Sequence, residues 1–80
     1  MKIKVLGSGG CSTCAKLERN VKEAVKELGL NAEIVKVEDY QEMMSYGIAA
    51  TPALVVDEEL LFEGWAPNIY ELKKILQGHV

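Results

Sequence analysis

The chain has 80 residues, 49% of them hydrophobic and 26% charged, a size and balance that suit one globular core. Its formal net charge is −3, and lysine and arginine are interleaved with glutamate, which argues against nucleic acid and anionic membranes as partners. The longest nearly apolar run, 48–56, is too short to span a bilayer, and the N-terminal segment lacks a secretory signal core. We therefore expect one domain over residues 1–80, monomeric and cytoplasmic, with no membrane association.

The first part of the chain predicts a strand, a loop and a long helix. Apolar residues of strand type occur in 1–6, and the Gly-Ser-Gly-Gly run at 7–10 then breaks the pattern. From Cys14 onward, apolar residues recur at helical spacing with charged residues on the other face. Gly29 can take the left-handed conformation that closes a helix, with Leu30 packing back on the last turn. We expect this helix to stop at Gly29.

The middle of the chain predicts a β-branched strand at 34–37 and a short helix after it. Asp39 can cap this helix while Glu42, three residues later, reaches back to the cap. The helix is expected to run to Tyr46 and to end at Gly47. Its large side chains are assigned to core and edge packing because they follow helical spacing: Tyr40, Met43, Met44 and Tyr46.

The last part predicts a hairpin and a helix. Residues 53–56 suit a buried strand, and 60–62 suit its partner across Asp57 and Glu58. Pro67 suits the first position of a final helix whose apolar stripe ends near Gly78. The predicted order of elements is therefore βαβαββα.

Cys11 and Cys14, in the run Gly10-Cys11-Ser12-Thr13-Cys14, give the strongest functional signal. They follow a strand and a glycine loop and open a helix, a context typical of redox-active CxxC motifs. At the helix N-cap, backbone amides and the helix dipole favour a thiolate and lower a cysteine pKa from about 8.5 to about 3.5–7.5. We predict Cys11 as the nucleophile and Cys14 as the resolving cysteine. Gly10, Ser12 and Thr13 form the motif loop.

The cysteine pair is also compatible with three alternatives. Cysteine is common in protein cores, so two buried cysteines without chemistry are the first. A thiolate pair before a helix also suits Cu(I), and a ferredoxin-like metallochaperone begins in the same way but ends in a strand, where residues 69–76 here predict a helix. A redox-sensing adaptor is the third. A zinc site needs about four ligands and His79 is the only histidine, so we predict no metal site.

Pro52 comes just before an apolar run that suits a central strand, where proline is tolerated only at the first residue. With CxxC at the start of the first helix and Thr51-Pro52 before the later strand pair, the chain resembles the thioredoxin-like family along nearly its whole length. It is most similar to small glutaredoxin-sized redox-active disulfide proteins of archaea and bacteria, through the run Gly-Ile-x-x-Thr-Pro-Ala-Leu-Val-Val at 47–56.

The resemblance implies an α/β, thioredoxin-like fold with a four-stranded mixed sheet flanked by helices. It also implies a cis peptide bond between Thr51 and Pro52, beside the cysteine pair. The Thr51 backbone would then pair with a bound polypeptide in β fashion. Gly64 and Trp65 would complete the substrate-binding surface, although Trp65 equally suits a core or hairpin anchor.

The chain departs from its larger relatives at several positions. Thioredoxin has Trp where Gly10 stands and Gly-Pro where Ser12-Thr13 stands, and its buried acid is missing because no Asp or Glu precedes Glu18. The glutathione-gripping Gly-Gly-Asp of glutaredoxins is replaced by residues 64–66, Gly-Trp-Ala. The family's redox potential and glutathione use therefore do not carry over.

The sequence as a whole predicts an enzyme, a thiol-disulfide oxidoreductase that reduces protein or small-molecule disulfides through Cys11 and Cys14. No cofactor is expected. The resemblance implies a flavin-dependent disulfide reductase as the electron donor.

Overall fold

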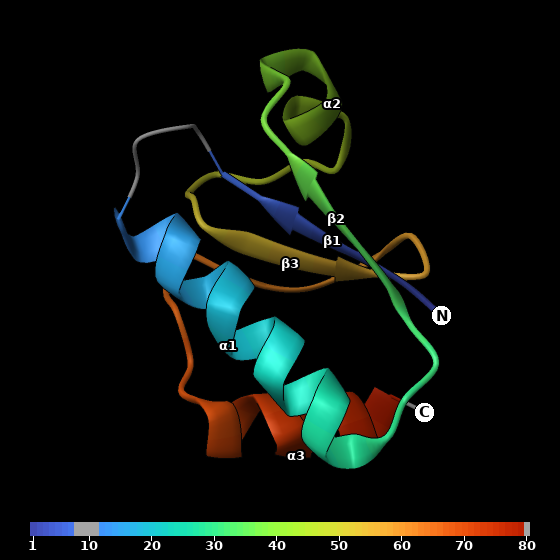
Figure 1. The fold of residues 1–80 in the computed structure, drawn as a ribbon. Coiled ribbons are helices and arrows are strands. Elements are labelled where there is room, and N and C mark those ends of the chain that lie inside the picture. The colour runs from blue at the N-terminus through green and yellow to red at the C-terminus, as the bar shows by residue number, and fades with distance from the viewer. Residues whose placement is uncertain (8–11, 80) are drawn as a thin grey trace.

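The computed structural model describes residues 1–7 and 12–79. In this part of the chain the elements follow the predicted order βαβαββα (Figure 1). The strands are β1 (Lys2–Leu6), β2 (Glu33–Val37), β3 (Ala53–Val56) and β4 (Glu59–Glu63), and the helices are α1 (Ser12–Leu28), α2 (Tyr40–Ser45) and α3 (Ile69–His79).

The strands form a mixed sheet in the order β2-β1-β3-β4. β1 runs parallel to β2 and antiparallel to β3, and β3 pairs antiparallel with β4. The Ala-Leu-Val-Val sequence of β3 is buried along its whole length, as expected for a continuous apolar run with both faces covered. Because the register pairs Leu6 with Ala53, the end of β1 and the start of β3 lie at the same end of the sheet.

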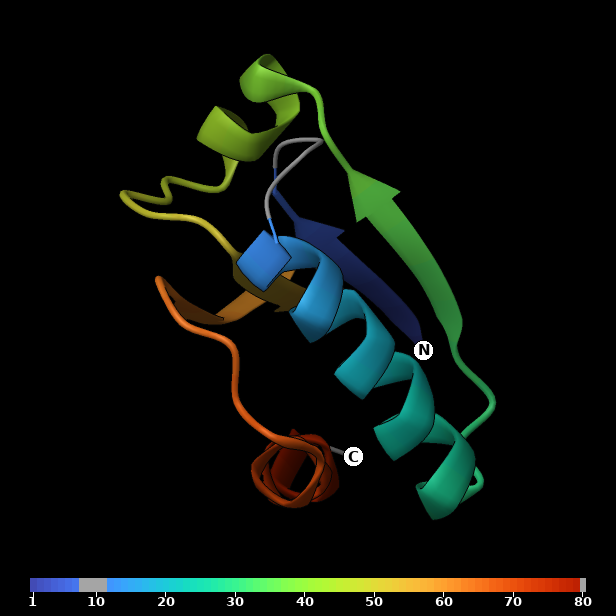
Figure 2. The ribbon, with the colours of Figure 1, turned by 60° about the vertical axis from the view of Figure 1, so that its left-hand side comes forward.

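Helices cover both faces of this sheet, which confirms the predicted fold class. α1 and α3 lie on the same face (Figure 2) and share a core with β1 and β3 made of Ile3, Val5, Leu17, Val21, Ala24, Val25, Leu54, Val56, Leu72 and Leu76. α2 lies on the other face, at the end where β1 and β2 finish, over a smaller core made of Leu6, Val37, Met43, Ile48, Ala53 and Val55. The sequence alternation along β1 explains this division, since successive strand residues point to opposite faces.

The stop of α1 at Gly29 is confirmed. Gly29 has a φ of 66°, its N–H donates to the Lys26 carbonyl at 3.2 Å, and the Leu30 N–H donates to the Val25 carbonyl at 3.1 Å. This pair of bonds is the Schellman motif, which satisfies carbonyls left over at a helix C-terminus.

Of the two predicted capping interactions of α2, the one made by the Asp39 side chain is confirmed. The Asp39 carboxylate accepts the Glu42 N–H at 3.3 Å. The Glu42 carboxylate, in contrast, lies 3.5 Å from Lys4 Nζ on β1, so its ion pair joins the helix to the sheet.

The predicted start of the last helix was wrong by two residues. Pro67 is not its first residue: α3 begins at Ile69, and Asn68 is the cap, because its Oδ1 accepts the Glu71 N–H at 2.8 Å. The Pro67 carbonyl instead accepts a hydrogen bond from Asn20 Nδ2 of α1 at 3.2 Å. The helix also continues past Gly78, which lies within it.

The hairpin between β3 and β4 has a two-residue turn, Asp57-Glu58, with φ values of 49° and 69°. Such turns favour glycine or asparagine. Here the side chains of both turn residues contact β1. Asp57 Oδ1 accepts the Lys2 N–H at 2.8 Å, and the Glu58 carboxylate lies 3.1 Å from Lys4 Nζ.

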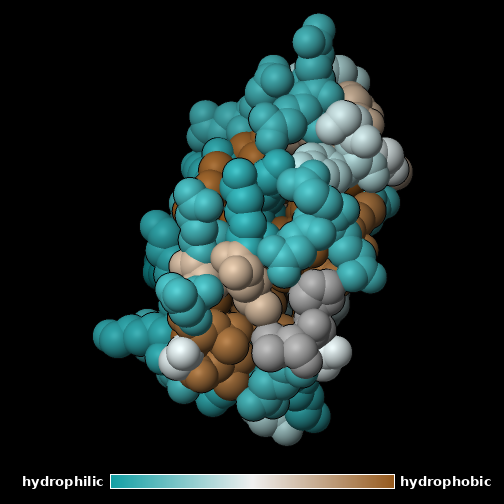
Figure 3. Space-filling model, turned by 90° about the vertical axis from the view of Figure 1, so that its right-hand side faces the viewer, coloured by the Kyte–Doolittle hydropathy of each residue, from teal (hydrophilic) through white to brown (hydrophobic). Residues whose placement is uncertain are grey.

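The last element is a helix, α3. A ferredoxin-like metallochaperone fold would end in a strand, so the last element here differs from that architecture. Among the described residues, no helix has both the length and the apolar character needed to cross a membrane. The side of the molecule at the right of Figure 1 is mainly hydrophilic, and its hydrophobic residues form separate patches (Figure 3).

Candidate active site

Cys14 lies in the first turn of α1, on the helix face that enters the core with Leu17 and Val21, and its relative exposure is 0%. Gly7, just after β1, packs against it. A Cβ atom at residue 7 would overlap Cys14 Sγ and come within 2.7 Å of Cys14 Cβ. The Gly7 N–H donates to the Val37 carbonyl at 3.0 Å, which fixes the backbone in this position. The position of the Cys14 thiol therefore requires a residue without a side chain at position 7.

The Thr51–Pro52 peptide bond reaches the same end of the sheet. It is cis in the structure, and Pro52 is buried while Thr51 is exposed. Ala53, the next residue, pairs with Leu6, which directly precedes Gly7. The register of β1 and β3 thus brings Thr51 and Pro52 to the end of the sheet that also holds Gly7.

The loop after β4 runs beside Pro52. The Gly64 N–H donates to the Pro52 carbonyl at 2.7 Å, and Gly64 has a φ of 86°, a conformation that favours glycine. Trp65 is 45% exposed, and its ring lies 5.6 Å from that of Phe62 at an interplanar angle of 53°. Trp65 therefore packs partly against the hairpin end through Phe62, and the rest of its surface faces solvent; its role in substrate binding stays a prediction.

Glu63, at the end of β4, holds the segment that leads to Thr51. Both of its carboxylate oxygens accept the Ala49 N–H, each at 3.2 Å. Glu63 pairs with Ala53 in the sheet, so the bond ties residue 49 to the edge strand. The segment before Pro52 is thus held through the N–H of Ala49.

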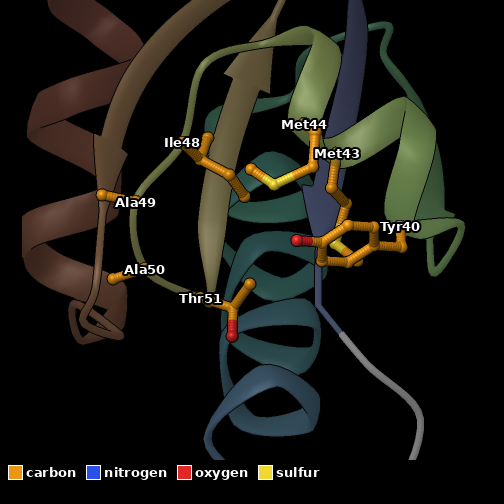
Figure 4. A pocket seen from close by; sticks show the side chains of 7 residues that line it. All are labelled: Tyr40, Met43, Met44, Ile48, Ala49, Ala50 and Thr51. Atoms are coloured by element: carbon orange, nitrogen blue, oxygen red, sulfur yellow. The ribbon is translucent and has the colours of Figure 1, made fainter.

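A pocket of about 340 Å³ lies between α2 and this segment, lined by Tyr40, Met43, Met44, Ile48, Ala49, Ala50 and Thr51. Figure 4 shows the Met44 and Ile48 side chains pointing toward one another, and Tyr40 reaching from α2 toward Thr51. Met43 and Ile48 are each 6% exposed, whereas Tyr40 is 71% and Met44 41% exposed. The assignment to packing thus holds for Met43, but Tyr40 and Met44 face solvent at the pocket.

A polar cluster centred on Lys4 lies on the α2 face of the sheet. Lys4 Nζ lies 2.5 Å from Tyr46 Oη and 3.1 Å from Glu58 Oε1, and the Tyr46 hydroxyl donates to Glu58 at 2.9 Å. The hydrogen bonds with Tyr46 and Glu58 raise the pKa of Lys4. Those from Lys4 and Tyr46 lower the pKa of Glu58. This Lys4 cluster joins the end of α2, the hairpin turn and the central strand.

Charge is distributed unevenly along the chain. Residues 37–72 contain no lysine or arginine but hold eight of the 12 acidic residues: Glu38, Asp39, Glu42, Asp57, Glu58, Glu59, Glu63 and Glu71. The same stretch includes α2, the pocket lining, Thr51 and the hairpin. Three of these acids lie on or next to elements that line the pocket: Asp39 and Glu42 at the start of α2, and Glu63, which accepts the Ala49 N–H.

The predicted motif residues are placed in part. Gly10 and Cys11 lie outside the described residues. Ser12 and Thr13 are exposed in the first turn of α1, next to the buried Cys14. Among residues 1–7 and 12–79, no group of three or more His, Cys, Asp and Glu side chains is arranged to hold a metal ion.

Sequence reasoning missed five residues that shape this end of the sheet: Gly7, Tyr40, Met44, Ile48 and Glu63. Gly7 was assigned only to a strand-breaking loop, and its contact with the cysteine follows from the three-dimensional register. Periodicity placed the two α2 residues on a helix without showing which of them faced solvent. Nothing in the local sequence distinguishes Glu63 from other strand-end acids.

The chain matches a protein-family model described as a thioredoxin domain over residues 1–77. It is 45% identical over 76 residues to a thioredoxin of Methanothermobacter thermautotrophicus, a match that covers 95% of this chain and 97% of that protein. It is 40% identical over 78 residues to a thioredoxin of Methanocaldococcus jannaschii, covering 98% and 88% respectively.

Solved structures share the fold. Thioredoxin 1 from the thermophilic eubacterium Thermosipho africanus superposes with a TM-score of 0.65 at 16% identity, over 99% of this chain and 93% of that one. A malarial protein superposes with a TM-score of 0.72 at 13% identity, over 99% and 96%. At these identities the likeness concerns the fold alone.

Proposed function

Since this chain belongs to the thioredoxin family, a family of thiol-disulfide oxidoreductases, we propose that it reduces disulfides through a dithiol cycle of Cys11 and Cys14. The observation that supports this most directly is the place of Cys14. It is buried in the first turn of α1, against Gly7 and at the end of the sheet that carries Thr51 and Pro52. A cysteine three residues earlier in the chain is then the natural point of attack on a substrate.

The cycle balances without a cofactor. The Cys11 thiolate attacks one sulfur of the substrate disulfide, that S–S bond breaks, and the other substrate sulfur leaves as a thiolate and takes up a proton. Cys14 gives up its proton and attacks Cys11 Sγ, which releases the second substrate thiol. The substrate has gained two electrons, and the chain has lost two by forming the Cys11–Cys14 disulfide.

The burial of Cys14 fits the role of the resolving cysteine. A thiol with no exposed surface does not meet substrates directly. It reacts only with a sulfur that is brought to it within the protein, as Cys11 Sγ would be in the mixed disulfide. In this proposal Cys11 attacks the substrate disulfide and Cys14 resolves the mixed disulfide.

The substrate chain is proposed to lie along the exposed Thr51 and to pair with its backbone. Gly64 leaves the approach open because it has no side chain, and Trp65 offers a partly exposed apolar rim. Ser12 and Thr13 are exposed in the first turn of α1. Together with Gly10 they form the motif loop in this proposal.

A disulfide-reducing cycle needs a source of two electrons per turnover. The proposed donor is a flavin-dependent disulfide reductase, and the proposed substrates are proteins or small molecules that contain a disulfide. The monomeric state, the single domain over residues 1–80 and the cytoplasmic location stay predictions.

Trapping of mixed disulfides tests the cycle. In Cys14→Ser the attack by Cys11 proceeds but resolution does not, so covalent adducts with a disulfide-containing protein accumulate. Non-reducing electrophoresis and mass spectrometry identify the adduct and its site. Cys11→Ser is the matched control and should form no such adduct.

Equal and negligible trapping by the two variants would contradict the cycle. A turnover assay with reduced chain and a protein disulfide separates a catalyst from a redox-sensing adaptor, since the adaptor gives no more than one turnover. Tight Cu(I) binding without dithiol activity would favour the metal-binding alternative.

A further inference from the structure

The pocket between α2 and residues 48–51 has a chemical character that the dithiol cycle does not require. It opens beside Thr51, where the substrate chain is proposed to pair, so a side chain of that substrate would reach it. This inference therefore rests on the proposed function and concerns which substrates the site prefers.

The pocket is apolar and partly open. Met43 and Ile48 are almost fully buried and form its base, while Tyr40 and Met44 stand at its mouth with 71% and 41% of their surface exposed. Methionine side chains adapt to ligands of different shape, and exposed large apolar groups gathered at one place mark interaction sites. A volume of about 340 Å³ is at the small end for ligand pockets and suits one large apolar side chain.

Negative charge surrounds this mouth. Asp39 caps α2 beside Tyr40, Glu42 lies on the same helix, and the Glu63 carboxylate bonds to Ala49 of the lining. The hydrogen bonds that Asp39 and Glu63 accept come from backbone N–H groups, which carry no net charge. A basic partner would therefore be attracted here.

Cations within the described part of the chain offset this charge only in part. Lys4 is within ion-pair distance of Glu42 but is engaged with Glu58 and Tyr46 as well, and its side chain is 13% exposed. Lys36 pairs with Glu38 at 3.3 Å. The remaining acids leave a negative surface at the place where a substrate would arrive.

We propose that this pocket selects polypeptide substrates that carry a large apolar side chain next to the disulfide, flanked by lysine or arginine. The apolar side chain enters between Tyr40, Met44 and Ile48. The flanking cation lies against Asp39 and Glu63. Charge complementarity of this kind speeds association and is screened by salt.

Three cyclic disulfide peptides test the preference. They share one ring and differ beside the disulfide: leucine flanked by lysine, leucine flanked by glutamate, and alanine flanked by lysine. The second-order rate constant for their reduction by the full-length reduced chain is measured at low and high salt. The leucine–lysine peptide should react about tenfold faster than either of the others at low salt, and high salt should erase only the lysine–glutamate difference.

Variants assign the effect to the pocket. Tyr40→Ala and Met44→Ala should each reduce the leucine–alanine difference about threefold or more. Tyr70→Ala is the matched control, because Tyr70 is a similarly exposed tyrosine (64%) on α3, on the other face of the sheet. Asp39→Asn should reduce the lysine–glutamate difference about twofold while keeping the helix cap, and Glu23→Gln on α1 controls for the change in net charge.

The outcomes separate the two proposals. Equal rates for the three peptides, or an equal response to Tyr40→Ala and Tyr70→Ala, would overturn the substrate preference and leave the dithiol cycle in place. Failure of the reduced chain to reduce any of the peptides and a small aromatic disulfide would overturn the cycle itself.

Discussion

The α-carbon of Gly7 faces the Cys14 side chain so closely that a methyl group at residue 7 would collide with the sulfur. Gly7→Ala must therefore push Cys14 or the end of β1 aside. Overpacking of this kind costs about 1–3 kcal/mol of unfolding free energy, to be measured by urea denaturation. If Cys14 resolves mixed disulfides as proposed, its displacement should also make those formed at Cys11 persist longer than in the wild type.

Gly78→Ala is the control for this experiment. Gly78 lies within α3 and a Cβ atom there would meet open space, so alanine should leave the stability unchanged or raise it by up to about 1 kcal/mol. Equal effects of the two substitutions would show that the contact with Cys14 is unimportant.

Glu63 is expected to position the proposed substrate-docking segment through its bond to Ala49 N–H. Glu63→Ala should raise the KM for a protein disulfide about threefold to tenfold and lower stability by about 0.5–1.5 kcal/mol. Reduction of a small aromatic disulfide, which does not pair with residues 49–51, should keep its rate. Glu63→Gln retains one acceptor oxygen and should restore most of the KM. A uniform loss with both substrates would indicate general destabilisation instead.

The pKa of Glu58 is lowered by hydrogen bonds from Lys4 and Tyr46, which makes stability depend on pH. A carboxyl whose pKa is lower in the folded chain adds stability above its unfolded pKa and loses it as the pH falls through the folded pKa. Glu58→Gln should therefore melt below the wild type at pH 7. The gap should close as the pH falls below about 4.

Thermal melts from pH 7 to pH 3 measure this gap, with Glu23→Gln as a control for the change in net charge. A gap that stays the same at every pH would mean that the glutamine perturbs the turn itself and that the charge of Glu58 contributes nothing.

Asn68 caps α3 through the Glu71 N–H. Asn68→Ala should lower the unfolding free energy by about 1 kcal/mol, and Asn68→Asp, which keeps the acceptor, should be close to neutral. Urea denaturation of the three proteins checks the order. If alanine proved as stable as asparagine, the cap bond would make no net contribution.

The elements of the fold were predictable because local physics determines them. The apolar spacing after Cys14 and the glycine at 29 define α1 without any tertiary information. The start of α3 was misplaced because Pro67 and Asn68 are both good signals for a helix start. The structure decides between them: Asn68 caps the helix, and the Pro67 carbonyl accepts a hydrogen bond from Asn20 of α1.

The site was predictable to a smaller extent. The CxxC spacing and Thr51-Pro52 are local signals, whereas the closeness of Gly7 to Cys14 depends on how β1 and α1 pack. The pocket depends on the orientation of α2, and the same sequence pattern that buries Met43 exposes Met44. Spacing along a helix cannot distinguish these outcomes at a six-residue element.

Strand β3 lies between two other strands and is buried on both faces. Its amides should therefore exchange with deuterium only when the whole protein unfolds. Pro52, and with it the segment that lines the pocket, is attached directly to this inner strand. The proposed docking edge is thus an extension of the buried centre of the sheet, and we expect a substrate that binds there to supply most of the conformational adjustment itself.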